Sequence, residues 1–131
     1  MQTIRTMIVD DDAGFRRRVR EFLASEPDIE IVGELADGLE VVPRARELKP
    51  DVVLMDVRMP GLNGINATRL LKDEMPELKL IMLSVFDLPE YQEAAMVSGA
   101  SAYVVKKSMI VDLVPTIRRV CSARRSAAST P

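Results

Sequence analysis

The sequence contains no histidine and a single cysteine, Cys121. Without histidine, neither a Ser-His-Asp nor a Cys-His catalytic system can form, because the general base is missing. A zinc site of the usual His/Cys kind is excluded for the same reason, and one cysteine cannot form a disulfide within the chain. Any chemistry must therefore come from carboxylates, hydroxyls, lysines or a metal ion that prefers oxygen ligands.

The sequence also lacks a large charge surplus and any long apolar run. Lysine and arginine number 18 against 20 acidic residues, a formal net charge of −2, which is not the basic surplus typical of nucleic-acid binding. No apolar stretch approaches the length of a membrane span, and the first residues do not have the pattern of a signal peptide. With 131 residues, 47% of them hydrophobic, we expect one soluble cytoplasmic domain with a real core and no membrane partner.

Two kinds of apolar pattern alternate along the chain. Short, nearly continuous apolar runs are typical of strands that are buried on both faces of a parallel sheet. Stripes at helical spacing separate them, so the chain reads as five strand–helix units, which favours an α/β fold with a sheet covered on both faces. We predict strands at 4–9, 29–35, 52–55, 78–83 and 102–105, and helices at 15–23, 39–48, 65–75, 91–98 and 109–120.

Two prolines and the last residues complicate this prediction. Pro43 and Pro115 lie in the second and fifth predicted helices, where each is tolerated only near the helix start. We therefore expect Asp112 to be a late N-cap of the fifth helix, with a kink as the alternative. The composition after Arg125 becomes small and polar, which predicts a domain over 1–123 and a linker-like tail over 124–131.

Chemically reactive side chains follow the ends of four predicted strands. In a parallel sheet these ends meet at the edge where ligands bind. That edge would collect carboxylates, one hydroxyl and one ammonium from distant parts of the sequence: Asp10, Asp11, Asp12, Asp56, Ser84 and Lys106.

This combination of groups suits phosphoryl transfer to a carboxylate. Clustered carboxylates repel one another unless a cation is present, and Mg²⁺ prefers oxygen ligands. A carboxylate can itself be the nucleophile toward phosphorus, while Mg²⁺ and Lys106 would stabilise charge on the transferring group. The Ser84 hydroxyl can donate a hydrogen bond to an anionic oxygen.

Four segments together resemble the motifs of response-regulator receiver domains. They are IVDD at 8–11, LMDVRMPG at 54–61, MLS at 82–84 and GASAYVVK at 99–106, and the resemblance covers residues 4–122 in the right order. It implies a flavodoxin-like, three-layer (βα)5 fold whose parallel sheet has the strand order 2-1-3-4-5. Such domains are signalling modules rather than enzymes, and at most catalyse their own phosphoryl transfer and dephosphorylation.

The resemblance also assigns roles to individual residues. Asp56 corresponds to the aspartate that accepts the phosphoryl group from a sensor histidine kinase. The ligands of Mg²⁺ would be Asp10, Asp11, Asp56 and the backbone carbonyl of Arg58. The remaining matches are Ser84 and Tyr103, as the switch hydroxyl and switch aromatic, and Lys106, as the lysine that contacts the phosphoryl oxygens.

Two features of the sequence resemble those of one subgroup of receiver domains. Lys107, where many members have proline, and MPGLNG at 59–64 are similar to receivers of the LuxR/NarL/FixJ type, which precede a helix-turn-helix domain. This implies control of transcription, contact with DNA only through a C-terminal domain beyond this chain, and homodimerisation on phosphorylation as an option. Asp12, often histidine in the subgroup, and Pro43 depart from the pattern.

Other interpretations stay open at this point. A haloacid-dehalogenase-like phosphatase would use Asp10 as nucleophile and Asp12 as acid, but it needs a further acidic motif after Lys106, where only Asp112 follows. A degenerate receiver would act only in protein–protein interaction. Taken alone, the three aspartates could be a strand stop and a helix N-cap, and Tyr103 a packed amphipathic side chain.

Overall fold

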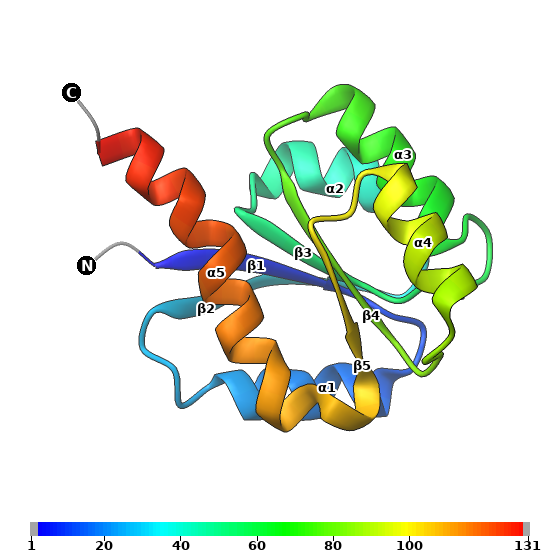
Figure 1. Ribbon diagram of the computed structural model, residues 1–131, viewed down its shortest axis with the longest axis horizontal. Coiled ribbons are helices and arrows are strands. Elements are labelled where there is room, and N and C mark those ends of the chain that lie inside the picture. Colours follow the sequence, from blue (N-terminus) through cyan, green and yellow to red (C-terminus); the bar gives the residue numbers. More distant parts are fainter. Residues whose placement is uncertain (1–2, 130–131) are drawn as a thin grey trace.

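The computed structural model describes residues 3–129, with side chains through residue 122, and shows five strands alternating with five α-helices (Figure 1). The strands are β1 (Ile4–Val9), β2 (Ile29–Leu35), β3 (Val52–Met55), β4 (Lys79–Ser84) and β5 (Ala102–Val105). The helices are α1 (Ala13–Leu23), α2 (Val41–Leu48), α3 (Gly64–Glu74), α4 (Pro89–Ser98) and α5 (Met109–Ser129), the last preceded by a 3₁₀ turn, η1 (Lys106–Ser108).

All five strands form one parallel sheet in the order β2-β1-β3-β4-β5. This confirms the predicted α/β class and the strand order that the resemblance implied. Val9 pairs with Met55, and Met55 pairs with Met82, so β1, β3 and β4 end close together. The residues that follow these ends therefore share one edge of the sheet.

The sheet separates two hydrophobic cores. Side chains alternate across a strand, so Ile8 of β1 faces the core beneath α1 and α5, while Met7 faces the core beneath α2, α3 and α4. Figure 1 shows this division, with α1 and α5 on one face of the sheet and the other three helices opposite. The continuous apolar runs in the sequence are thus explained by burial on both faces.

The fifth helix begins where its apolar stripe indicates, but its N-cap differs from the prediction. It begins at Met109, directly after η1, and places Asp112 in its first turn, so Asp112 is not its N-cap. Pro115 lies inside the helix instead of at its start. The 3₁₀ turn η1 connects β5 directly to this helix. By contrast, Pro43 is the third residue of α2, where its missing N–H has no helical partner, as predicted.

The other boundaries agree to within a few residues. β4 begins at Lys79 and includes Ser84, so the serine is the last residue of the strand. Helix α5 continues to Ser129, into the segment predicted as a tail, and residues 130–131 of that segment lie outside the described residues. The division into a domain and a linker remains a prediction. None of the described helices combines the length and the apolar character that a membrane span requires.

Candidate phosphoryl-acceptor site

Two buried carboxylates lie at the carboxyl ends of β1 and β3. Asp10 is 2% exposed and Asp56 8% exposed. The Asp10 amide donates to the Leu35 carbonyl and the Asp56 amide donates to the Val9 carbonyl, so both backbones continue the sheet ladder. The first residue of α3, Gly64, passes so close that an added Cβ would lie 1.9 Å from the Asp56 carbonyl oxygen. Only glycine fits this approach, which fixes the loop after Asp56.

Lys106 lies between these carboxylates. Its Nζ is 2.7 Å from Oδ2 of Asp10 and 3.3 Å from Oδ2 of Asp56, and its side chain is 12% exposed. The same ammonium lies 4.0 Å from the centroid of the Phe15 ring, a cation–π contact. A buried pair of carboxylates is costly without a cation, and this lysine, which directly follows β5, supplies one.

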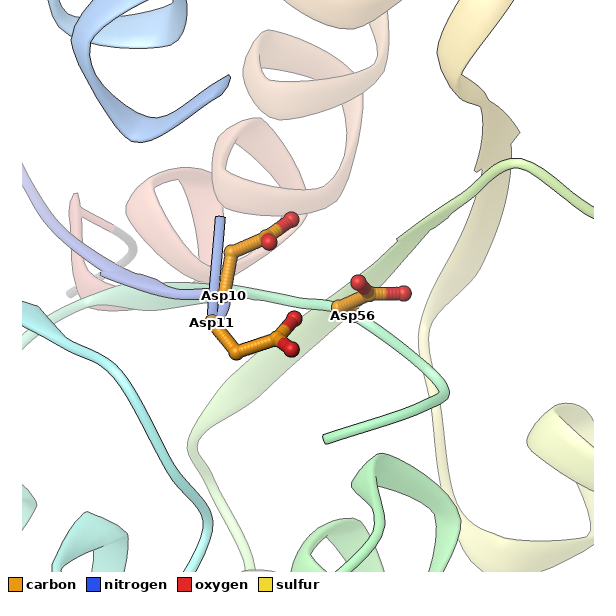
Figure 2. A group of neighbouring side chains, drawn as sticks. All are labelled: Asp10, Asp11 and Asp56. Atoms are coloured by element: carbon orange, nitrogen blue, oxygen red, sulfur yellow. The ribbon is translucent and has the colours of Figure 1, made fainter. Parts of the chain in front are cut away.

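Asp11 adds a third carboxylate. Oxygen atoms of Asp10, Asp11 and Asp56 all lie within 4.8 Å of one another, and Asp11 is exposed while the other two are buried. Figure 2 shows the Asp11 side chain extending from the end of β1 toward Asp56. Three oxygen donors at this separation, with no nitrogen or sulfur among them, fit a hard divalent cation such as Mg²⁺.

Asp12 caps helix α1 instead of joining the three carboxylates of the site. Its carboxylate accepts from the Phe15 amide at 3.1 Å and caps the N-terminus of α1. Its own amide donates to Oδ1 of Asp10 at 2.9 Å. Of the three consecutive aspartates, one is therefore a helix cap, and the other two face the site. A phosphatase that needs Asp12 as a free acid is disfavoured by this engagement.

Burial raises the pKa of Asp56 above its ordinary value of 3.8. The Lys106 ammonium opposes the shift, and the neighbouring Asp10 carboxylate adds to it. The charged form of Asp56 is thus disfavoured in the folded, metal-free protein relative to the unfolded chain.

This shift predicts how Asp56→Asn changes stability with pH. Because the folded pKa is raised, Asp56 costs nothing below pH 3.8, and its cost grows as the pH rises through the folded pKa. In EDTA, Asp56→Asn should therefore melt at a higher temperature than the wild type at pH 7. Thermal melts from pH 7 downward should show the difference shrinking toward pH 3.8, whereas a constant difference would contradict the role of the Asp56 charge.

Ser84 and Tyr103 meet at one backbone position, that of Phe86. The Ser84 hydroxyl, fully buried, accepts from the Phe86 amide at 3.1 Å. The Tyr103 hydroxyl donates to the Phe86 carbonyl at 2.7 Å. Burial raises the pKa of Tyr103, and a hydrogen bond with Ser84 opposes this. The two side chains are therefore connected through a single residue of the loop between β4 and α4.

The Arg58 side chain also reaches this loop. Its guanidinium carbon lies 5.1 Å from the centroid of the Phe86 ring, whose other neighbour is Tyr91, stacked at 4.5 Å. The Arg58 amide approaches Oδ1 of Asp56 at 3.4 Å. The sequence predicts a role only for the backbone carbonyl of Arg58, and this contact of its side chain with Phe86 was not predicted.

Comparison with known proteins agrees with the geometry. Residues 6–118 match the family model described as the response regulator receiver domain. The chain belongs to this family. Response regulator protein VraR of Staphylococcus aureus is 35% identical over 117 residues, which cover 89% of this chain and 56% of that protein. The receiver domain thus spans about half the length of the curated relatives that it matches.

Solved structures show the same fold for this receiver domain. The response regulator domain of Thermotoga maritima CheB superposes with a TM-score of 0.85 at 33% identity, covering 92% of this chain and 98% of that one. A LuxR-family two-component response regulator from Aurantimonas sp. SI85-9A1 gives a TM-score of 0.89 at 32% identity, covering 93% and 87%. The flavodoxin-like prediction and the family resemblance are both confirmed.

The structure brings most of the predicted site residues of the receiver domain together. Asp10, Asp56 and Lys106 are in direct contact, with Asp11 beside them. Ser84 and Tyr103 form a neighbouring pair. Phe15 and Phe86 were missed, because their contacts depend on side chains from other elements and no pattern in the local sequence indicates them. The chemical roles of the site residues remain predictions.

Proposed function

We propose that this receiver domain accepts a phosphoryl group on Asp56. The observation that carries the proposal is the position of Lys106 between Asp10 and Asp56, with Asp11 beside them at the same sheet edge. In the transfer, an Asp56 carboxylate oxygen forms a bond to phosphorus. The bond from phosphorus to the donor breaks, and its electron pair leaves with the donor.

A metal ion is part of this proposal. The carboxylates of Asp10, Asp11 and Asp56 would hold Mg²⁺ together with the backbone carbonyl of Arg58. When bound, Mg²⁺ supplies positive charge that offsets charge on the phosphoryl oxygens. Lys106 supplies a second positive charge from the β5 side, where its Nζ already lies within 3.3 Å of Asp56.

The phosphorylated state would change the surface through Ser84 and Tyr103. Ser84 holds the Phe86 amide, so a hydroxyl that turns to donate to a phosphoryl oxygen releases that amide. Tyr103 holds the carbonyl of the same residue, so its environment changes at the same time. Phosphorylation at the sheet edge is thus read out at the loop before α4.

The partners follow from the family. These 131 residues contain no histidine, so the phosphohistidine donor lies outside them, and the family supports a sensor histidine kinase as that donor. The similarity to VraR and to a LuxR-family regulator supports control of transcription as the output. As the resemblance to receivers of the LuxR/NarL/FixJ type implies, DNA would be contacted through a helix-turn-helix domain C-terminal to the receiver. Homodimerisation on phosphorylation and a cytoplasmic location complete the proposal.

Incubation with Mg²⁺ and acetyl phosphate, followed by intact-mass measurement, tests the proposed function. The wild type should gain the mass of one phosphoryl group, and EDTA should prevent the gain. Steady hydrolysis of diverse phosphoesters would favour a phosphatase instead. The absence of any labelling, in a sample shown to be folded by circular dichroism, would favour an interaction-only domain.

A further inference from the structure

Arg16, which is not among the predicted site residues, contacts the backbone of Asp10 directly. Arg16 lies one turn into α1, and its side chain is 18% exposed. Its Nη1 donates a short hydrogen bond to the backbone carbonyl of Asp10. Its Nε lies 3.4 Å from Oε1 of Glu34 on β2, and among the described residues this buried nitrogen has no hydrogen-bond partner.

With this contact, every polar group of Asp10 is engaged. Its amide donates to Leu35, its carbonyl accepts from Arg16, and its two carboxylate oxygens accept from Asp12 and Lys106. A peptide bond is planar, so fixing the Asp10 carbonyl also fixes the direction of the Asp11 amide. The peptide from which Asp11 begins is therefore held in one orientation.

The position of the Asp11 carboxylate depends on the backbone that Arg16 fixes, more than the positions of the Asp10 and Asp56 carboxylates do. Its side chain is exposed, and among the described residues its carboxylate accepts no hydrogen bond. Asp10 and Asp56 are each held by Lys106, whereas Asp11 is directed toward the site only by the backbone on which it stands. A change in the peptide between Asp10 and Asp11 would move this carboxylate first.

The Arg16 guanidinium is itself held in place by Glu34 on β2. Glu34 pairs with Arg16 on one side and with Arg20, at 2.6 Å, on the other, so β2 anchors the guanidinium. Burying a guanidinium with one nitrogen lacking a hydrogen bond disfavours folding, and an apolar side chain could fill the space without that cost. Packing alone therefore does not account for an arginine at this position.

We propose that Arg16 is a positioning residue for the divalent-metal site. By linking Glu34 on β2 to the Asp10 carbonyl, it holds the Asp10–Asp11 peptide in the orientation that places the Asp11 carboxylate beside Asp10 and Asp56. This inference rests on the proposed function, which supplies the metal ion.

The test compares Arg16→Gln with Arg20→Gln. Both variants remove one arginine from Glu34, but only Arg16 touches Asp10, so Arg20 is the matched control. Mg²⁺ affinity is measured by isothermal titration calorimetry, and stability by urea unfolding in EDTA. We expect the Mg²⁺ dissociation constant to rise roughly tenfold in Arg16→Gln, the scale known for residues that support metal ligands. Arg20→Gln, which loses a partly exposed ion pair, should stay within about twofold of the wild type.

The outcomes separate this inference from the proposed function. Wild-type affinity in Arg16→Gln, with only the unfolding midpoint lowered, would show a structural role and overturn the inference while leaving the metal site intact. A wild type that does not bind Mg²⁺ overturns both. If Arg16→Gln does not fold, Arg16→Lys carries the test. One ammonium cannot span Glu34 and the Asp10 carbonyl as the guanidinium does, so weaker Mg²⁺ binding is expected, and wild-type affinity would again overturn the inference.

Discussion

Asp56→Asn is expected to abolish labelling by acetyl phosphate. The substitution removes the carboxylate that contacts Lys106 at the end of β3, and an amide cannot replace it as the nucleophile. Intact mass in the presence of Mg²⁺ should remain that of the unmodified chain, whereas the wild type gains one phosphoryl group. Because asparagine is nearly the same size, the fold should be retained, which a circular dichroism spectrum checks.

Two further variants serve as comparisons for the Asp56→Asn result. Asp73→Asn changes an exposed aspartate on α3, away from the site, and should be labelled like the wild type. Asp10→Asn should weaken labelling by weakening metal binding. If label survived in Asp56→Asn and vanished in Asp10→Asn, Asp10 would be the acceptor and the assignment of Asp56 would be wrong.

Of the substitutions proposed for this protein, Lys106→Ala should lower the free energy of unfolding the most. Without the ammonium, Asp10 and Asp56 become two buried like charges with no cation between them. Removing one partner from a buried ion pair typically costs about 3–5 kcal/mol, so we expect a loss of about 3 kcal/mol at pH 7 in EDTA, measured by urea unfolding. Lys107→Ala, which removes the exposed neighbouring lysine, is the control and should change stability by less than about 0.5 kcal/mol.

The electrostatic origin of this loss can be checked separately. A divalent cation neutralises the same carboxylates, so saturating Mg²⁺ should restore much of the stability of Lys106→Ala. The restored part should exceed the gain that Mg²⁺ gives the wild type. An equal gain in both proteins would indicate that lost packing against Phe15, and not lost charge, causes the instability.

The sequence predicted the parts of this molecule that depend on periodicity. Continuous apolar runs and helical stripes located all five strands and helices, because each pattern reports which faces of an element are buried. Strand ends then located the site, since the carboxyl ends of parallel strands share an edge. Asp10, Asp56 and Lys106 could be brought together on this basis before any contact was known.

Other features could not be predicted because they depend on contacts between elements. Phe86 joins Ser84 to Tyr103 through its backbone, which carries no sequence signal. The run of arginines that begins at Arg16 is typical of a solvated helix face, yet the Arg16 side chain is only 18% exposed and contacts Asp10. The expected N-cap at Asp112 was wrong, because α5 begins at Met109, directly after the 3₁₀ turn η1, and Pro115 lies inside the helix.

The order of strands has a consequence for how the chain assembles. After β1 and β2 pair, β3 adds beside β1, and β4 and β5 then each add beside the strand before them, so the sheet grows from one edge in the direction of synthesis. Asp10 and Asp56 are brought together when β3 joins β1, two strands before β5 delivers Lys106. Until β5 arrives, the acidic pair repels itself without relief. We therefore expect docking of the last strand to be the step of folding that is most sensitive to salt and to Mg²⁺.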